Sequence, residues 1–404
     1  MFGKKTQSAQ ISSARHPDFA YLPDPTYYFD TACQSLRPAP VISAIENYYK
    51  EFNACGGRVK YAWGKKVDEA VEAAREKTLR FLNLPDKDYR VSFTLNTTYG
   101  LNLILSQLKA GNYKRVVTSD IEHNSVFLPT ITLAKRLGIP RAVLNRSADG
   151  SLNYSPSDLD QAVVVLNATS NIDGRLLTNL EAIAEDTHSR GGILIIDAAQ
   201  TTAHHANLLQ KTTADAICFS SHKMYGPSMG VIVFKKSLLD RIDLEFVGGG
   251  MVSAVTEQSY ELLPDDLSSR FEAGLQDWAG IIGYSEAIDW IQNFKNNGQN
   301  AQNYMKNMSQ KLYDKLGEIP GLHILNNGPS AVISVYHDKH DAHRLAQFLS
   351  EAHVMVRSGY FCCHYYLLEK QQLPPMLRFS IGLHTSEQDI EAVDNYLRRF
   401  IGVK

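Results

Sequence analysis

The sequence predicts an α/β protein with a mostly parallel central sheet flanked by helices, plus a smaller α/β domain at the C-terminus. From about residue 90, short β-branched runs alternate with longer amphipathic stretches, which is typical of βαβ units. The runs 163–166 and 193–196 are continuously apolar, as expected for central strands that are covered on both faces. At 404 residues the chain also exceeds the usual size of one domain, so a second lobe is expected.

The elements of the larger lobe follow one another at short intervals. Helices are expected at 101–108, 126–137 and 180–189, where apolar residues recur at helical spacing. They separate the expected strands, which are residues 90–94, 115–119, 141–145, 162–167, 192–197, 215–219 and 230–234.

The pattern changes after about residue 285. The expected elements are a helix at 299–315, a strand at 331–336, a helix around 342–352, and strands at 354–357 and 376–380. A last helix follows, because Ser386 and Asp389 resemble a capping box before an apolar helical repeat. We therefore predict an N-terminal segment at 1–25 packed on the small domain, a large domain at 26–285 and a small domain at 286–404.

The composition favours a small-molecule enzyme of the cytoplasm. With 44% apolar residues and a net charge of -2, the chain offers no electrostatic footprint for nucleic acid or an anionic membrane. No apolar stretch is long enough to span a bilayer, and the N-terminus lacks the apolar core of a signal peptide. Five cysteines without metal-type spacing suggest neither a disulfide framework nor a metal site, so any special cysteine is expected to be a reactive thiol.

Two charged residues stand where open α/β sheets bind ligands. Asp197 ends an apolar strand, and Lys223 follows the next strand in the run Ser-Ser-His-Lys-Met-Tyr-Gly-Pro, so both can reach one site. A buried carboxylate beneath a protonated pyridine would keep that ring cationic, and a buried lysine loses its proton more easily. Asp197 could equally cap the next helix, and a lone lysine in a loop is usually a solvated surface residue.

A phosphate site is expected at the start of the helix near residue 101. Thr97 and Thr98 precede the apolar helix, and the first turn of a helix carries unpaired N–H donors and the positive end of the dipole. Ser220 and His222 lie close to Lys223 in the same segment and could also hold a phosphate. As simple helix caps, the two threonines would need no ligand.

Together these residues resemble class V aminotransferase-fold enzymes, and the closest resemblance is to group II cysteine desulfurases of the SUF type and selenocysteine lyases. The resemblance runs from about residues 28–30 to the C-terminus and implies fold type I of the pyridoxal 5′-phosphate (PLP) enzymes. It implies that Lys223 forms an imine with PLP and that His123 stacks on the ring and acts as acid or base. The cofactor-binding residues it implies are Thr97, Thr98, His123, Asn171, Asp197, Gln200, Ser220, His222 and Lys223.

The C-terminal lobe should decide which bond is broken. Arg378 interrupts an apolar strand, and its planar fork of donors suits a substrate carboxylate, although a structural ion pair would also explain it. The resemblance adds Asn171 and Arg357 to the substrate-binding residues. It also places Cys362, within the segment 356–364, at the position of the nucleophile that takes sulfur from L-cysteine. Without that resemblance, Cys362 and Cys363 would be interpreted as buried packing.

Three departures from the family pattern concern the substrate more than the cofactor. Tyr360 and Phe361 replace two histidines beside the nucleophile, and Cys363 adds a second thiol that could carry the sulfur. Leu275 stands where the family usually has a threonine that reaches the phosphate of a neighbouring subunit. Gly57, before Arg58, stands where the family commonly has histidine.

The resemblance implies a homodimeric cysteine desulfurase that converts L-cysteine to L-alanine. Its persulfide would supply sulfur, through an acceptor protein, for Fe–S clusters or other thio-cofactors. The alternatives are a selenocysteine lyase, another C–S lyase, or an aminotransferase or epimerase without a catalytic thiol. A non-catalytic scaffold of sulfur assembly is disfavoured by the intact Lys223.

Overall fold

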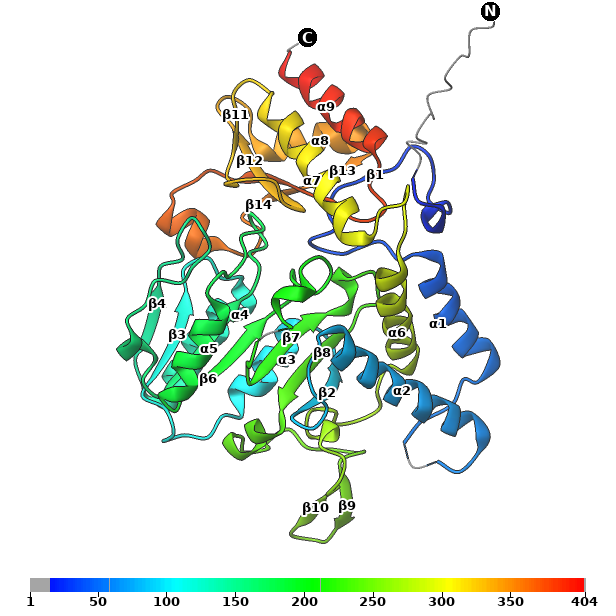
Figure 1. Cartoon of the computed structure of the whole chain (residues 1–404), viewed down its shortest axis with the longest axis vertical. Helices are drawn as coiled ribbons and strands as arrows, with labels where there is room; N and C mark the ends of the chain where they lie inside the picture. Colours follow the sequence, from blue (N-terminus) through cyan, green and yellow to red (C-terminus); the bar gives the residue numbers. More distant parts are fainter. Residues whose placement is uncertain (1–14, 58, 211, 403–404) are drawn as a thin grey trace, which may run out of the picture.

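The large lobe is built on a parallel sheet with one reversed strand. The computed structural model describes residues 15–57, 59–210 and 212–402. Within these residues the sheet has seven strands in the order β2-β8-β7-β6-β5-β3-β4 (Figure 1). Only β8 runs antiparallel to its neighbours. The strands are β2 (Tyr89–Thr94), β3 (Arg115–Ser119), β4 (Arg141–Leu144), β5 (Ala162–Asn167), β6 (Ile193–Asp197), β7 (Ala216–Ser220) and β8 (Gly230–Lys235).

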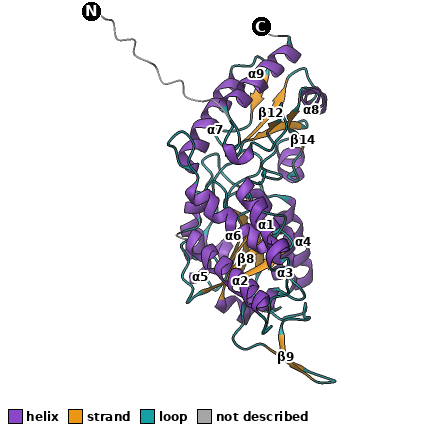
Figure 2. Cartoon of the chain, turned by 90° about the vertical axis from the view of Figure 1, so that its right-hand side faces the viewer, coloured by secondary structure: helices purple, strands orange, loops and turns teal. Residues whose placement is uncertain are grey.

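All seven strands expected for this lobe are therefore confirmed, with shifts of one residue at some ends. The two continuously apolar runs form β5 and β6, which lie inside the sheet and are buried along their whole length. Their burial follows from helices on both faces of the sheet, as Figure 2 shows. Apolar strands of this kind hold the carboxyl end of β6, and with it Asp197, in a fixed position.

The helices divide into two layers. One face of the sheet packs on α2 (Ala62–Phe81), α5 (Leu180–Ser189) and α6 (Trp278–Asn293), while α1 (Ala39–Glu51) packs outside α6. The other face packs on α3 (Thr97–Ser106) and α4 (Asn124–Leu137). Alternate residues of each strand pack against the two helix layers, because successive side chains of a strand point to opposite faces of the sheet.

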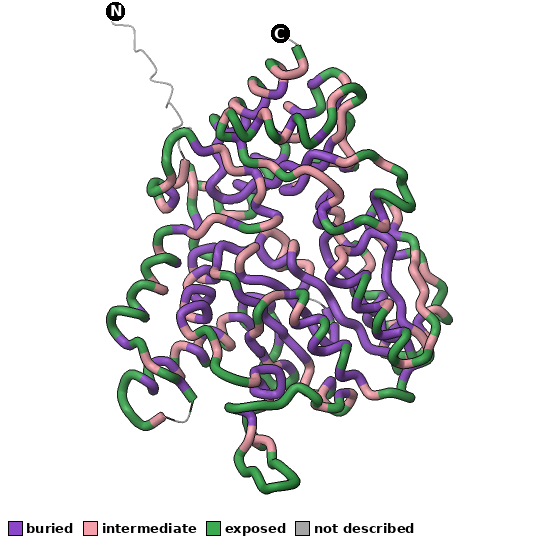
Figure 3. Tube along the Cα trace, turned by 180° about the vertical axis from the view of Figure 1, so that it is seen from behind, coloured by how far each residue is buried: buried purple, intermediate pink, exposed green. Residues whose placement is uncertain are grey.

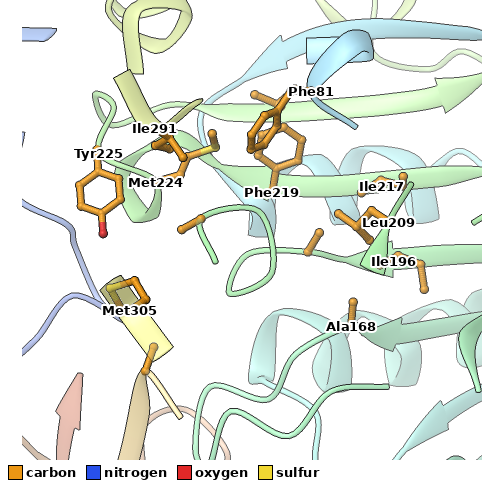
Figure 4. Packing of buried hydrophobic residues seen from close by; sticks show 14 of the residues in the cluster. Phe81, Ala168, Ile196, Leu209, Ile217, Phe219, Met224, Tyr225, Ile291 and Met305 are labelled. Carbon is orange, nitrogen blue, oxygen red and sulfur yellow. The ribbon is translucent and has the colours of Figure 1, made fainter. Parts of the chain in front are cut away.

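The segment that carries Lys223 is anchored by the core of the first face. Phe219 of β7 points toward Phe81 of α2, and Met224 and Tyr225 continue the same apolar cluster toward the small lobe (Figure 4). Tyr225 is fully buried, and its hydroxyl accepts a hydrogen bond from the Leu383 N–H at 2.9 Å. Burying a large side chain contributes about 1.5–3 kcal/mol. The residues on both sides of Lys223 are thus fixed by packing.

The small lobe is an antiparallel sheet of four strands, within the described residues, with helices α7, α8 and α9 packed on it (Figure 2). Ser386 accepts from the Asp389 N–H, and Asp389 accepts from the Ser386 N–H, so the predicted capping box is confirmed. The elements are β11 (Leu322–Ile324), β12 (Val332–His337), β14 (Arg357–Gly359), β15 (Met376–Ser380), α7 (Ala301–Gly317), α8 (Ala342–Glu351) and α9 (Glu387–Ile401).

Two expected elements differ from the structure. The helix expected at 101–108 begins at Thr97, because the Asn96 side chain accepts from the Tyr99 N–H and starts the helix four residues earlier. The strand expected at 354–357 is two strands, β13 (Val354–Met355), which pairs with β1 (Tyr27–Tyr28), and β14, which pairs with β15. The break between them directs Arg357 toward Arg378, its partner across the sheet.

Several elements were not anticipated. They include β1, β11, α1, α2 and α6. The hairpin of β9 (Val252–Val255) and β10 (Tyr260–Leu262) was not anticipated either; it projects from the large lobe and is mostly exposed (Figure 3). The expected domain boundary at 285 falls inside α6, which continues to Asn293 and packs on α1 and α2. Among the described residues, none of the helices combines the length and the apolar character that a membrane crossing requires.

The described part of the N-terminal segment contacts both lobes. Phe19 is fully buried against Trp290 of α6 and His384 of the small lobe. Asp18 accepts a hydrogen bond from the Trp290 indole at 2.7 Å, and Arg15 pairs with Asp389 of α9 at 3.9 Å. Residues 1–14 of the expected segment lie outside the described residues.

His384 should make folding stability depend on pH. Burial lowers its pKa to about 4, and its Nε2 lies 2.9 Å from the Tyr28 carbonyl. The unfolded chain therefore binds a proton at this histidine near pH 6.5, whereas the folded chain binds it only near pH 4. The contribution of the neutral ring to the unfolding free energy is complete above pH 6.5 and is lost as the pH falls toward 4. Between pH 7 and pH 5, the unfolding free energy of the His384→Asn variant should fall by about 2 kcal/mol less than that of the parent. Urea unfolding of parent and variant at both pH values measures this, and equal pH dependence of the two proteins would contradict it.

Candidate active site

A pocket of about 410 Å³ lies where the carboxyl ends of β6 and β7 meet the start of α3. Every residue that the sequence placed at the cofactor lines this one pocket, although they come from five separate parts of the chain. The lining residues are Asn96, Thr97, Thr98, His123, Ser125, Asn167, Thr169, Asn171, Asp197, Ala199, Gln200, Ser220, His222 and Lys223. A pocket at the carboxyl ends of parallel strands is the usual ligand site of an open α/β sheet.

Asp197 and Lys223 both line the pocket. Asp197 ends β6, and Lys223 ends the short turn Ser221–Lys223 directly after β7. One oxygen of Asp197 accepts from the Ala199 N–H at 2.9 Å within the turn that follows β6. No helix begins at this turn, so the alternative role of a helix cap for Asp197 was wrong. Burial raises the pKa of Asp197, and the Ala199 N–H and Lys223 partly oppose this. Burial likewise lowers the pKa of Lys223, and Asp197 opposes that change.

Hydroxyl groups and a helix start line one end of the pocket. The Thr97 N–H donates to Ser220 Oγ at 2.9 Å, and the Thr97 and Ser220 hydroxyls lie 2.6 Å apart. The Thr98 hydroxyl contacts the Ser125 hydroxyl at 2.6 Å. Within the described residues, the buried Nδ1 of His222 has no hydrogen-bond partner, and burial lowers the pKa of this histidine to about 4. These donors at the start of α3 fit a phosphate group.

His123 is a neutral ring at the pocket wall. It precedes α4, and its Nδ1 accepts from the Ser125 N–H at 3.0 Å, so the ring proton resides on Nε2. Burial lowers the pKa of His123 to about 3, and the nearby charges of Lys223 and Arg378 act in the same direction. The capping role that histidine often has is therefore present here, together with a place in the pocket.

Two amides of the pocket are held by the chain itself. Gln200 Nε2 donates to the Ala32 carbonyl at 2.7 Å, and Asn171 Nδ2 donates to the Phe361 carbonyl at 2.8 Å. Asn171 also accepts from the Cys363 thiol at 3.1 Å through its Oδ1. Asn171 thereby connects the pocket to the cysteine segment.

The cysteine segment has an unusual backbone. Phe361 and Cys362 have φ values of 49° and 58°, which place two successive non-glycine residues in the left-handed region. The turn is held from outside, because the Asn124 N–H donates to the Cys362 carbonyl at 2.7 Å and Asn171 holds Phe361. Such strain persists only where surrounding contacts fix it. Cys362 is exposed on this turn.

The two adjacent thiols lie in different surroundings. Cys362 is exposed, whereas Cys363 is buried and its thiol donates to Asn171. Burial raises the pKa of Cys363 well above its usual value, so this residue stays a neutral thiol. Of the two, only Cys362 is placed to meet a substrate or a partner.

Two arginines share one carboxylate at the pocket edge. Arg378 is buried; it donates to Asp30 at 3.1 Å and to the Asn171 carbonyl at 3.1 Å. Arg357 is exposed and donates to the other oxygen of Asp30 at 3.4 Å. The structural ion pair, which was the alternative to a substrate-binding role for Arg378, is thus present. The buried Nε of Arg378 has no partner among the described residues, so one donor stays free.

No role was predicted for Asp30, although the resemblance begins near this residue. In the sequence, Asp30 is only a carboxylate directly after two aromatic residues, and this pattern does not reveal that two arginines of the small lobe lie opposite it. Ser125 was also missed, because a serine at a helix start is ordinary.

The three departures lie away from the centre of the pocket. Leu275 is exposed, and Gln276 donates to the carbonyls of Glu272 and Gly274 within its own turn. Gly57 is exposed, while Arg58 lies outside the described residues. Phe361 is buried beneath Arg378, with the guanidinium carbon 4.9 Å from the ring centre.

Comparisons with known proteins agree with this arrangement. Residues 27–393 match the family model described as aminotransferase class V. A probable cysteine desulfurase of Halalkalibacterium halodurans is 28% identical, with 93% of each chain covered. A cysteine desulfurase of Escherichia coli is also 28% identical over 93% of each chain. A solved cysteine desulfurase of Thermococcus onnurineus has a TM-score of 0.84 at 25% identity and covers 93% of this chain and 95% of that one.

Proposed function

Because the chain belongs to the class V aminotransferase family, we propose that it is a PLP-dependent cysteine desulfurase. It converts L-cysteine to L-alanine and keeps the released sulfur as a persulfide on Cys362. One observation carries the proposal: the exposed Cys362 lies on a turn that is held at Phe361 by Asn171, and Asn171 lines the same pocket as Lys223. The curated relatives at 28% identity are named cysteine desulfurases, which supports the same reaction.

The pocket residues fit the cofactor at each of its polar groups. The hydroxyls of Thr97, Thr98 and Ser220 with the free Nδ1 of His222 would hold the phosphate. Asp197 would face the ring nitrogen, and Lys223 would hold the aldehyde carbon. When bound, PLP supplies an electron-accepting ring that makes the α-hydrogen of an amino acid acidic.

Around the cofactor, each remaining residue binds, orients or moves a proton. His123, neutral at physiological pH, would pack against the ring without adding a charge. Asn171 and Gln200, which line the same pocket, would lie near the phenolic oxygen of the ring. Lys223 can exchange the α-proton because burial lowers the pKa of its amine and so favours the form that accepts a proton.

Arg378 and Arg357 bind the substrate carboxylate. The unpartnered Nε of Arg378 supports this role, since a buried guanidinium N–H without a partner is costly until a ligand accepts from it. Asp30 neutralises and orients both guanidiniums before substrate arrives. Cys362 attacks the substrate sulfur, so that the carbon–sulfur bond breaks and a sulfur–sulfur bond forms on the enzyme.

Incubation with L-cysteine and a reductant tests the reaction, with alanine and sulfide measured together. Equal amounts of the two products are expected. An amino exchange between alanine and a keto acid, without sulfide, would instead support an aminotransferase. Selenocysteine assayed in parallel separates the lyase alternative, because a selenocysteine lyase should leave cysteine unreacted.

The partners and the location are part of the same proposal. Exposed apolar residues Phe246, Val247 and Leu275, on a lobe with an isolated hairpin, support a homodimer; light scattering of the purified chain would give the dimer mass. The exposed Cys362 suits transfer to an acceptor protein that supplies Fe–S clusters or other thio-cofactors. The five cysteines are all free thiols, which supports a reducing, cytoplasmic location.

A further inference from the structure

Phe361 stands between the two groups that act on the substrate. It is the residue before Cys362, and its side chain is buried beneath Arg378, with the guanidinium carbon 4.9 Å from the ring centre. This position is one of the departures from the family pattern, since the resembled family has histidine there. One residue thus contacts the arginine that binds the substrate carboxylate and directly precedes the thiol that attacks the substrate sulfur.

The ring supports the guanidinium of Arg378 on its face, while hydrogen bonds hold its edge. Arg378 donates to Asp30 at 3.1 Å and to the Asn171 carbonyl at 3.1 Å through its two terminal nitrogens. Two bonds at the edge leave the plane able to rock about the line that joins them, and a ring beneath the plane opposes this motion. The attraction between a guanidinium and an aromatic ring is strongest where water is excluded, as at this buried arginine.

The backbone of Phe361 sets the turn that carries the nucleophile. Phe361 and Cys362 have φ values of 49° and 58°, which non-glycine residues adopt only where their surroundings hold them. The Phe361 carbonyl accepts from Asn171 Nδ2 at 2.8 Å, and the Phe361 ring is buried in an apolar cluster. The other buried members of this cluster are Ile121, Ile172, Cys363, Tyr366, Leu367 and Met376. The same buried ring therefore anchors the turn and supports the arginine.

Asn171 connects the two halves of this arrangement. Its backbone carbonyl accepts from Arg378, and its side-chain amide donates to the Phe361 carbonyl. Phe361, Asn171 and Arg378 thus form a closed set of three contacts, in which a shift of one residue changes its contacts to the other two. A change at the ring should reach both the guanidinium and the turn of Cys362.

We propose that Phe361 is a positioning residue that couples substrate binding to sulfur transfer. Its ring holds the Arg378 guanidinium in place for the substrate carboxylate, and its backbone holds Cys362 where the thiol meets the substrate sulfur. The inference rests on the proposed function, because it concerns the carboxylate and the sulfur of L-cysteine. It adds that one apolar residue fixes how far the carboxylate-binding arginine lies from the nucleophile.

Phe361→Leu tests the part of the proposal that concerns Arg378. Leucine keeps a large apolar side chain in the cluster but offers no ring face to a guanidinium. Titration of the holoenzyme with L-alanine, followed by the absorbance of the bound cofactor, measures the binding of an amino acid that has a carboxylate and no sulfur. The dissociation constant should rise about 3–30-fold, the range expected for a lost arginine–ring contact.

Two further variants keep this test independent of any single replacement. Phe361→Tyr keeps the ring and should bind L-alanine within about threefold of the parent. Phe361→Met also lacks a ring, but its flexible side chain fills irregular space, so it should repeat the loss seen with leucine in a chain that folds. Parental binding in both Phe361→Leu and Phe361→Met would overturn the role of the ring.

The double variant Phe361→Leu/Arg378→Lys shows whether the ring acts through the arginine. Lysine keeps a positive charge but lacks the planar group that lies over the ring. If Phe361 acts through Arg378, Phe361→Leu should weaken L-alanine binding much less in the lysine background than in the parent. Effects that simply multiply would overturn the connection, because independent sites combine in that way.

The rate of sulfur transfer tests the part that concerns Cys362. At saturating L-cysteine, alanine formed in the first turnover reports the steps that follow binding. This rate should fall by about tenfold to a hundredfold in Phe361→Leu, since a small displacement of a reacting group lowers a rate by this order. Phe361→Tyr should again stay near the parent. Weaker binding with an unchanged rate, or the reverse, would overturn the coupling.

Phe93→Leu is the matched control. The Phe93 ring also lies beneath an arginine, with the guanidinium carbon of Arg75 5.0 Å from the ring centre, but neither residue lines the cofactor pocket. Both leucine variants should lower the thermal midpoint, whereas only Phe361→Leu should change L-alanine binding and sulfur transfer. An equal loss in Phe93→Leu would assign the effects to weakened packing and overturn the inference. If the parent formed no sulfide, the proposed function would fail, and the L-alanine titration would still decide the role of the ring.

Discussion

The Cys362→Ser variant should lose at least about 10²-fold of its alanine and sulfide formation from cysteine while keeping the bound cofactor. The hydroxyl of serine is a far weaker nucleophile than a thiolate at neutral pH, so the substrate sulfur has no acceptor. Cys362 does not line the cofactor pocket, and its contacts to Asn124 run through the backbone carbonyl. The absorption spectrum of the bound cofactor should therefore resemble that of the parent protein.

Cys363→Ser is the matched control for this variant. The neighbouring thiol is buried and donates to Asn171, and a serine hydroxyl can make the same hydrogen bond. Activity should change little compared with the loss in Cys362→Ser. The opposite result, a silent change at Cys362 and a large loss at Cys363, would transfer the nucleophile to the buried thiol and contradict the assignment made from exposure.

Much of the fold could be predicted because the pattern of the large sheet is local. Each buried strand is a short apolar run between turns, and β5 and β6 are apolar on both faces. The sequence could not show the division of residues 354–359 into β13 and β14, because that break depends on two different partner strands. Nor could it show that α6 continues beyond residue 285, since its apolar face is explained only by α1 and α2.

The cofactor residues were predictable from motifs, whereas the surroundings of the thiols were not. Asp197 and Lys223 stand at the ends of neighbouring strands, so their proximity follows from the sheet. The difference between Cys362 and Cys363 depends on a left-handed turn and on a bond to Asn171, almost two hundred residues away. The place of Asp30 depends on contacts of the segment 30–35 to both lobes, which no local pattern encodes.

The Lys223→Ala variant should lose turnover by about 10²–10⁴-fold or more and bind its cofactor without a bond to the protein. The variant removes both the amine that holds the cofactor and the group that moves the α-proton. Turnover, together with the absorption of the bound cofactor, measures both effects. Lys65→Ala, at an exposed lysine of α2, is the control and should leave both unchanged.

Lys223→Arg separates the charge of the lysine from its chemistry. Arginine keeps a positive charge facing Asp197, but its guanidinium stays protonated and cannot hold the aldehyde carbon or accept the α-proton. If Lys223 acts as proposed, the arginine variant should be as inactive as the alanine variant, with a thermal midpoint that shows the chain is folded. If the arginine variant retained most of the parent activity, Lys223 would serve only to pair with Asp197, and the lysine would be a structural cation rather than a catalytic residue.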